Sequence, residues 1–284
     1  MAIFDNQVKK IALGTVQFGL DYGISNNLGK TSETKVGEIL EHCMVNQIDT
    51  LDTAFGYGES EKVLGKFNLS DFKVISKFLD LVGSKGLDLE GQLEQGLNNL
   101  NLKAIYGYLA HRPLQVTNRE WDILQDLKNK GTIQKIGFSL NQTEEVDLVL
   151  KKGFIPDLVQ APFNYLDNRF TDKLSYLKDK WNTEIHTRSV FLQGLFFMNP
   201  NELPVFFEPI KKALGELENI ESKAGVLIKY VLDHPFIDKV VIGVNNLEQL
   251  AQNLAELSNA KDLKIFSKEI FPEECLMPSK WPKL

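Results

Sequence analysis

The sequence predicts one closed (β/α)8 barrel, an α/β fold of the TIM-barrel type, as a single domain over residues 1–284. Short apolar runs rich in β-branched residues alternate with amphipathic segments. Strands that alternate with helices pair in parallel, because a parallel connection needs a crossover. There are eight such runs, no GxGxxG motif follows the first, and no Pro/Gly-rich linker divides the chain. These observations favour the barrel over its alternative, an open doubly wound sheet.

The expected strands and helices follow one another along the chain. We predict strands at Ile11–Thr15, Ile48–Ala54, Lys73–Phe78, Ala104–His111, Lys135–Ser139, Leu158–Ala161, Glu184–Val190 and Lys239–Val244. We predict helices, from apolar residues at helical spacing, at Glu33–Asn46, Leu89–Leu100, Arg119–Lys130, Glu144–Lys151 and Leu247–Leu257. Thr31 or Ser32 can cap the first helix, and Gly131 and Gly153 are suited to end the third and fourth.

Three segments are too irregular for the repeating ring, namely Arg112–Asn118, Gly194–Pro209 and the tail at residues 262–284. In a barrel, the loops that follow the strands face the active site. We expect the tail to lie over this end of the barrel. The aromatic residues of the second and third segments either wall a pocket or cover the apolar barrel end; they are Phe196, Phe197, Phe206, Phe207 and Trp281.

Composition excludes several classes of function. The net charge is −6 and no basic cluster is present, so we expect no nucleic-acid partner. No apolar run approaches the length of a membrane span and the first residues lack a signal-peptide core, so we expect no membrane partner. Cys43 and Cys275 are not in metal or CxxC spacing, and His42, His186 and His234 show no metal spacing. We therefore expect reduced thiols, no metal and a cytoplasmic protein. Nothing in the pattern indicates an oligomeric state.

Unusual polar residues fall at the ends of three consecutive predicted strands. Asp52 lies near the end of the second strand, Tyr57 lies five residues further on, Lys77 nearly ends the third strand, and His111 ends the fourth. A buried lysine is costly without a counter-charge, so Lys77 should pair with Asp52. An ammonium beside a phenol favours release of the phenolic proton, so Tyr57 could protonate a developing alkoxide. His111 could then orient a carbonyl through a hydrogen bond.

Each of these residues has a simpler interpretation when taken alone. Asp52 could cap a turn, Tyr57 could be a loop aromatic, Lys77 could extend to the surface, and His111 could merely end its strand. Their occurrence together on consecutive strand ends favours a catalytic interpretation.

The order of several motifs carries a resemblance to a known family. Ile48–Phe67 reads IDTLDTAFGYGESEKVLGKF, in which Asp-Thr-Ala is followed by Tyr-Gly and a helix. The other motifs are LGTVQFG at 13–19, VISKF at 74–78, LAHRP at 109–113, KIGFS at 135–139, DLVQAPFN at 157–164, RSVFLQGL at 188–195 and GVNNLEQLAQN at 243–253. Over residues 11–258 the chain resembles the aldo-keto reductases.

This resemblance implies an activity and a set of site residues. It implies that the catalytic tetrad is Asp52, Tyr57, Lys77 and His111, the same four residues that strand-end chemistry selects. It implies reduction of an aldehyde or ketone with NADPH or sometimes NADH, bound extended across the barrel rather than on a Rossmann fold. The cofactor contacts that it implies are Thr15, Ser139, Gln160, Arg188, Ser189, Gly194, Gly243, Asn245, Gln249 and Asn253.

The chain departs from the family pattern at two positions near the expected nicotinamide. Leu140 stands where an Asn usually follows Ser139, which removes one expected amide contact. Arg188 stands where an aromatic residue commonly stacks on the nicotinamide ring. A planar guanidinium can also stack on a ring. Arg188 therefore either stacks there, or contacts an anionic group of the substrate, or turns outward to solvent.

The expected phosphate-binding segment is uncharged. Val244-Asn245-Asn246 leads into the last predicted helix, whose N-terminus is suited to an anion. Family members that prefer NADPH often place Lys or Arg between the equivalents of Gly243 and Asn253, but this chain has neither, and Gln249 stands where an Arg often does. We expect NADP as the cofactor, with NAD as the alternative.

The sequence thus predicts an NAD(P)H-dependent carbonyl reductase with a small-molecule carbonyl substrate. The long polar stretch at 19–29 suggests a sugar or another hydroxylated carbonyl. Two alternatives stay open: a cofactor-binding regulatory subunit, and a Schiff-base aldolase with Lys77 as the nucleophile.

Overall fold

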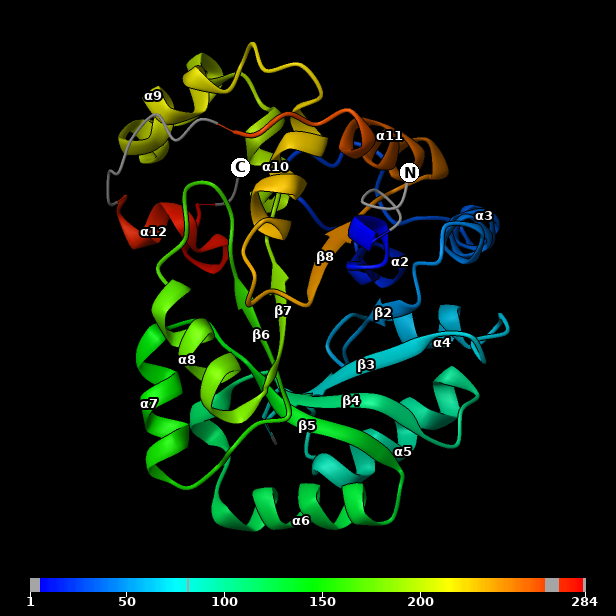
Figure 1. Cartoon of the computed structure of the whole chain (residues 1–284). Helices are drawn as coiled ribbons and strands as arrows, with labels where there is room; N and C mark the ends of the chain where they lie inside the picture. The colour runs from blue at the N-terminus through cyan, green and yellow to red at the C-terminus, as the bar shows by residue number, and fades with distance from the viewer. Residues whose placement is uncertain (1–5, 81, 264–270, 283–284) are drawn as a thin grey trace.

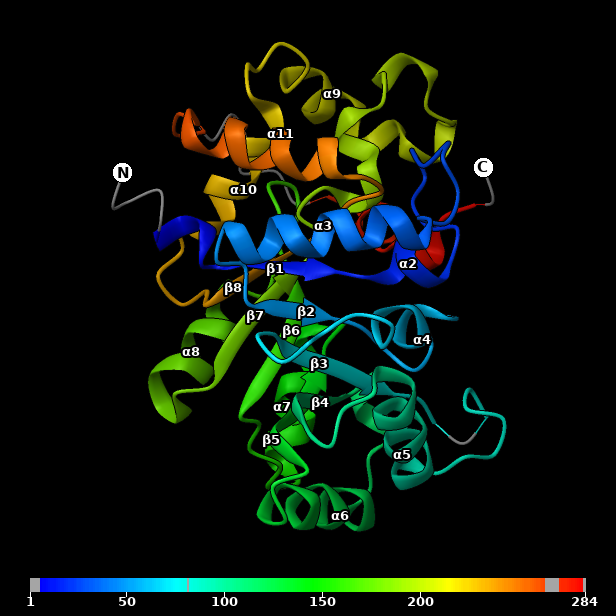
Figure 2. The same cartoon turned by 90° about the vertical axis from the view of Figure 1, so that its right-hand side faces the viewer.

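A computed structural model of the chain describes residues 6–80, 82–263 and 271–282. Eight parallel strands close into a barrel in sequential order, and helices surround them (Figures 1 and 2). The strands are β1 (Ile11–Gly14), β2 (Thr50–Asp52), β3 (Lys73–Phe78), β4 (Ile105–Ala110), β5 (Ile133–Ser139), β6 (Leu158–Pro162), β7 (Glu184–Arg188) and β8 (Lys239–Gly243). The predicted (β/α)8 barrel is confirmed.

Helices lie between the strands along the chain and, for the last two, after β8. They are α2 (Val16–Gly19), α3 (Glu33–Val45), α4 (Ser60–Leu64), α5 (Leu89–Leu100), α6 (Asn118–Asn129), α7 (Thr143–Lys151), α8 (Thr171–Trp181), α9 (Glu208–Glu216), α10 (Lys223–Leu232), α11 (Leu247–Ser258) and α12 (Glu273–Leu276). Local signals explain several ends: the Asp88 carboxylate caps α5 by accepting from the Gly91 amide at 2.9 Å, and Thr117 and Glu120 form a capping box on α6.

Short 3₁₀ turns occupy the segments that the sequence marks as irregular. They are η1 (Pro113–Gln115), η2 (Leu192–Phe197), η3 (Pro200–Glu202), η4 (Val205–Phe207) and η5 (Pro278–Lys280). Helices α8, α9 and α10 were not predicted. In α10 seven of the ten residues are buried, so its apolar side chains surround the helix and blur the one-sided pattern.

The strand register determines which side chains lie together at one end of the barrel. Gly14 of β1 pairs with Asp52 of β2 on one side and with Gly243 of β8 on the other. On β5 and β6, Ser139 pairs with Gln160. The carboxyl ends of all eight strands therefore meet at one end of the barrel, as a parallel barrel requires.

The aromatic residues expected as pocket walls divide into two groups. Phe197 lines the cavity described below, and its side chain is 47% exposed. Phe196 and Phe207 are fully buried, while Phe206 and Trp281 pack against the core, so a pocket-wall role is wrong for these four. They belong to the hydrophobic core or pack against it.

The described part of the tail lies against the loop after β5. Gln142, which follows that strand, donates a hydrogen bond to the Glu273 carboxylate and another to the Met277 sulfur at 3.4 Å. The Trp281 ring packs edge-on against Phe207, at 5.1 Å between centroids. None of residues 271–282 lines the cavity. Residues 264–270 and 283–284 of the expected tail lie outside the described residues.

Candidate active site

An ion pair lies buried at the end of β2 and β3. The Lys77 side chain is fully buried, and its Nζ donates to both carboxylate oxygens of Asp52 at 2.8 Å and to the Thr53 carbonyl at 2.9 Å. Burial opposes the charge of Lys77, but the adjacent Asp52 carboxylate outweighs it, so the pKa of Lys77 is raised. Lys77 is therefore a permanently charged ammonium, as the sequence predicts for a paired buried lysine.

Tyr57 projects its phenol toward this ammonium. Its Oη lies 3.4 Å from Lys77 Nζ, which also lies 4.9 Å from the centre of the ring. The backbone that carries Tyr57 is held directly against the end of α2. A Cβ on Gly19 would come within 1.8 Å of the Tyr57 carbonyl oxygen and within 2.4 Å of the Ser60 amide, so only glycine permits this contact.

His111 completes the group. Its backbone amide donates to the Phe78 carbonyl at 2.9 Å, and its ring meets Tyr57 edge-on at 6.1 Å between centroids. Burial, followed by the charges of Lys77 and Arg188, lowers the pKa of His111 to about 3. His111 is therefore neutral, and its buried Nδ1 has no partner among the described residues. A neutral imidazole can donate or accept one hydrogen bond with a ligand. We call Asp52, Tyr57, Lys77 and His111 the Tyr57 centre.

A cavity of about 990 Å³ opens from the Tyr57 centre across the barrel end. This volume is at the upper end of the range for ligand pockets. Twelve of the fourteen site residues expected from sequence line the cavity: Thr15, Asp52, Tyr57, His111, Ser139, Arg188, Ser189, Gly194, Gly243, Asn245, Gln249 and Asn253. Lys77 and Gln160 do not line it and lie behind it.

Gln160 contacts the Tyr57 centre through Asp52. Its Nε2 donates to Asp52 Oδ1 at 2.7 Å, so it shares the carboxylate with Lys77. Its Oε1 is buried without a hydrogen-bond partner among the described residues, and so is Oε1 of Gln17, a cavity residue. A buried amide oxygen without a donor is costly. The Gln17 oxygen, which belongs to the cavity lining, is thus suited to accept from a ligand amide or hydroxyl.

Arg188 fastens the loop that follows β5 and does not turn outward to solvent. Its Nη2 donates to the Leu140 carbonyl at 3.0 Å and to Asn141 Oδ1 at 2.7 Å. Arg169 donates to the backbone carbonyl of Asn141 at 3.0 Å. Two arginines therefore hold Asn141, which lines the cavity one residue after the position where the family pattern expects an amide. Sequence reasoning did not select Asn141.

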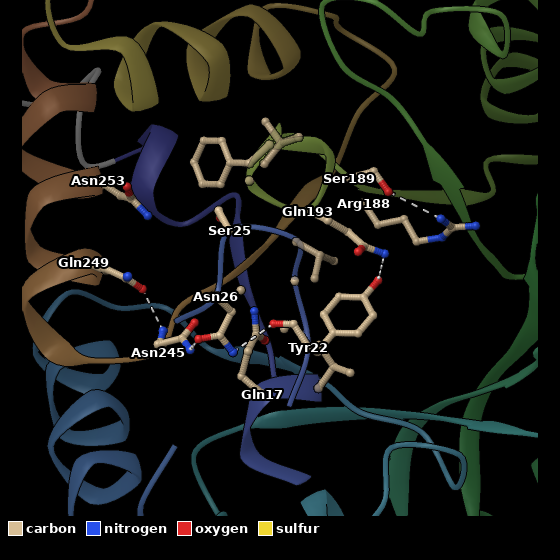
Figure 3. Close-up of a pocket in the computed structure, with 18 of the residues that line it drawn as sticks. Gln17, Tyr22, Ser25, Asn26, Arg188, Ser189, Gln193, Asn245, Gln249 and Asn253 are labelled. Carbon is tan, nitrogen blue, oxygen red and sulfur yellow. Dashed lines mark hydrogen bonds between the residues drawn. The ribbon is translucent and has the colours of Figure 1, made fainter. Parts of the chain in front are cut away.

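The loop after β1 crosses the cavity and joins its two sides (Figure 3). The Tyr22 hydroxyl accepts a hydrogen bond from Gln193 Nε2 at 2.8 Å, and Asn26 Oδ1 accepts one from Asn245 Nδ2 at 2.6 Å. A Cβ on Gly194 would come within 1.8 Å of Ser25 Oγ, and Gly194 has a φ of 92°. Sequence reasoning named the polar stretch at 19–29 but did not select Tyr22, Ser25 or Asn26. The residues that a loop places over a barrel end depend on its path, which no local sequence pattern indicates.

Helix α11 forms the other side of the cavity. The Asn246 side chain caps it by accepting from the Gln249 amide at 2.9 Å, and Gln249 Oε1 accepts from the Asn245 amide at 2.7 Å. Gln252 and Asn253 also line the cavity. We call Asn245, Gln249, Gln252 and Asn253 the α11 end. In Figure 3, Gln249 and Asn253 project from α11 on the side opposite Arg188 and Ser189.

The donor set fits a dinucleotide better than a metal. No group of three or more His, Cys, Asp or Glu side chains that could hold a metal occurs in the part of the chain that the structure describes. Polar side chains line the cavity at both ends instead, and the buried Gln17 amide oxygen remains for a ligand. Within the same described ranges, no helix has the length and apolarity to cross a membrane.

Comparisons with known proteins agree with the barrel fold. The aldo/keto reductase family model matches residues 10–267. An aldo-keto reductase of Bacillus halodurans in its holo form is 19% identical, with a TM-score of 0.71, over 90% of this chain and 88% of that one. A candidate aldo-keto reductase from Pseudomonas aeruginosa is also 19% identical, with a TM-score of 0.65, over 88% of this chain and 90% of that one.

A search of the curated proteins found no match. The two structural similarities lie at an identity that supports the fold alone. The family model covers nearly the whole barrel and matches the region in which the motifs resemble the family. The chain therefore belongs to the aldo/keto reductase family.

Proposed function

We propose that this chain reduces an aldehyde or ketone to an alcohol with NADPH or NADH, and that Tyr57 donates the proton. The observation that carries the proposal is the Tyr57 phenol, which opens onto the cavity 3.4 Å from a buried ammonium. A phenol so placed is a proton donor with its counter-charge already in position. When bound, reduced nicotinamide would supply the hydride to the carbonyl carbon.

The Tyr57 centre accounts for the proton. As the carbonyl oxygen gains negative charge, Tyr57 Oη transfers its proton to it, and the resulting phenolate is stabilised by Lys77. The Asp52 carboxylate keeps Lys77 charged and fixes its position through two 2.8 Å hydrogen bonds. Neutral His111 orients the carbonyl oxygen toward Tyr57 by a hydrogen bond. Because a neutral imidazole brings no charge, it does not compete with Lys77 for the phenolate.

Residues on both sides of the cavity are available to the cofactor. Ser139 and Asn141 line the cavity and offer a hydroxyl and an amide near the Tyr57 centre for the nicotinamide amide, whereas Gln160 holds Asp52 and does not line the cavity. Arg188 lies on the same side and would face a ring or an anionic group of the substrate. The α11 end offers amides to the adenosine. The polar loop residues Tyr22 and Gln193 favour a hydroxylated carbonyl as the substrate.

Two other functions receive less support. A Schiff-base aldolase needs a neutral Lys77 in contact with substrate. Lys77 is fully buried, does not line the cavity and is held charged by Asp52. A purely regulatory role for a bound cofactor would not need the Tyr57 centre to be complete.

The test is a screen of NADPH and NADH oxidation with aldehydes, ketones and aldoses, using wild type, Tyr57→Phe and Tyr176→Phe. Loss of the proton donor should lower turnover by about 10²–10⁴-fold. Tyr176 lies on the surface of α8, so its variant should keep wild-type turnover. Turnover that survives in Tyr57→Phe would refute the mechanism. A borohydride-trapped adduct on Lys77 would favour the aldolase.

A further inference from the structure

A lysine from outside the expected phosphate-binding segment reaches the cavity. Lys223 is the first residue of α10, and it lines the cavity together with its neighbours Ser222 and Ala224. Ser222, the N-cap residue of α10, has a φ of 55°, so the chain turns there as it enters the helix. Lys223 is twenty residues before Gly243 in sequence, so a search between Gly243 and Asn253 does not find it.

The start of α10 lies directly on α11. The Ala224 amide donates to Glu256 Oε2 at 2.8 Å, and Gln252 Nε2 donates to Glu256 Oε1 at 2.8 Å. A Cβ on Gly225 would come within 2.1 Å of the Glu256 carbonyl carbon, so the two helices touch through their backbones. This packing brings the chain at Lys223 beside Gln252 and the rest of the α11 end.

The charge of Lys223 has no acidic partner within 4.0 Å among the described residues. Its Nζ donates to the Phe196 carbonyl at 3.4 Å, which is a long contact. Partial burial lowers the pKa of Lys223, and the negative charge of Glu218 opposes this by raising it. The neighbouring carboxylate of Glu256 is already engaged by Ala224, Gly225 and Gln252.

The other charges that line the cavity are satisfied or lie elsewhere. Asp52 is paired with Lys77, and Arg188 lies on the side opposite the α11 end (Figure 3). Among the cavity-lining residues that the structure describes, Lys223 is therefore the cation available to an anionic group bound among Gln249, Gln252 and Asn253. With a nicotinamide at the Tyr57 centre, the far end of the dinucleotide is its adenosine ribose.

We propose that Lys223 binds the ribose 2′-phosphate of NADPH and gives the enzyme its preference for NADPH over NADH. This inference rests on the proposed function, because it requires a dinucleotide in the cavity. It supplies a cation for the cofactor expected from sequence, NADP, which the uncharged segment from Gly243 to Asn253 does not provide.

The experiment measures binding without turnover. Dissociation constants for NADPH, NADH, adenosine 2′,5′-bisphosphate and AMP are determined by calorimetry on wild type, Lys223→Gln, Lys223→Arg and Lys212→Gln. Lys212 is an exposed lysine of α9 that does not line the cavity, so Lys212→Gln removes the same charge elsewhere. Thermal unfolding of each variant shows whether the contact with Phe196 matters for folding.

We expect wild type to bind NADPH more tightly than NADH, and Lys223→Gln to lose about tenfold or more of its affinity for NADPH and for the bisphosphate. Affinity for NADH and AMP should stay within about twofold, Lys223→Arg should retain most of the preference, and Lys212→Gln should behave as wild type. Equal loss for NADPH and NADH would overturn the proposal, since the cation would then serve the pyrophosphate or the fold. Unchanged binding in Lys223→Gln, or a wild type without preference, would also overturn it.

Failure of this inference is distinguishable from failure of the proposed function. If wild type binds neither dinucleotide, the proposed function fails together with the role of Lys223. If both dinucleotides bind and Tyr57 supports turnover, but Lys223→Gln binds NADPH as wild type does, only the role of Lys223 is wrong.

Discussion

The Tyr57 centre and the α11 end are two sides of one cavity built in opposite ways. The Tyr57 centre comes from the ends of three neighbouring strands, and its buried ion pair is fixed by strand register. The α11 end comes from loops and helix starts, where side chains such as Asn246 and Gln249 satisfy nearby backbone amides themselves. The first side is organised before a ligand arrives. The second must exchange some of its own hydrogen bonds for those of a ligand.

Removal of the Lys77 cation from the Tyr57 centre has the largest expected effect on turnover and stability. In Lys77→Met, Asp52 stays buried without its counter-charge, so we expect turnover to fall below detection and the free energy of unfolding to drop by about 3–5 kcal/mol. Urea denaturation and the oxidation assay measure the two effects. The double variant Asp52→Asn/Lys77→Met should recover much of the stability and none of the turnover. A single variant that unfolds like wild type would show that the pair is not pre-organised.

The protonation state of His111 gives a second test of the same centre. Its pKa of about 3 in the folded protein lies below its usual value of about 6.5, so the unfolded chain takes up a proton first as the pH falls. The folded state should therefore lose about 2 kcal/mol at pH 5 relative to pH 7.5 through this residue, with the loss growing down to about pH 3. His111→Asn should lose correspondingly less over the same pH range in urea denaturation. Identical pH dependence in the two proteins would contradict a neutral, buried His111.

The contact between Gly194 and Ser25 tests the loops after β1 and β7, which cross the cavity between its two sides. Gly194→Ala places a methyl group against Ser25 Oγ at a φ of 92°, so the loops after β1 and β7 must separate. We expect about 1–3 kcal/mol of lost stability and weaker cofactor binding, with kcat changed little once cofactor saturates. Gly29→Ala is the control, since it has a φ of 69° but no atom within 4 Å of the added methyl. Equal effects in both variants would mean that backbone strain, and not the contact, is responsible.

The same contrast explains what the sequence could and could not predict. β3 was predicted to the residue and β6 to within one residue, because parallel barrel strands are continuous apolar runs with clear limits. Asp52, Lys77 and His111 could be grouped because strand ends must meet at one rim. Lys223 and Tyr22 could not, because their positions depend on how α10 packs on α11 and how a loop crosses the barrel. Asn141 was not selected either, because its place in the cavity lining depends on the loop after β5.

Arg188 holds the loop after β5 on the side of the cavity opposite the α11 end, and its variant has the smallest expected effect. Arg188→Met removes the hydrogen bonds to Leu140 and Asn141, but Arg169 still holds the Asn141 carbonyl. We expect the KM for cofactor or substrate to rise about three- to tenfold, with little loss of stability, since roughly one net hydrogen bond's free energy is lost. A rise in the KM for substrate that is confined to anionic carbonyls would mean that Arg188 contacts the substrate. A rise in the KM for cofactor, whichever carbonyl is reduced, would mean that Arg188 positions Asn141 or faces the nicotinamide. Unchanged affinity for cofactor and for every substrate would leave Arg188 with no role in the cavity, and the Tyr57 centre would then work without support from β7.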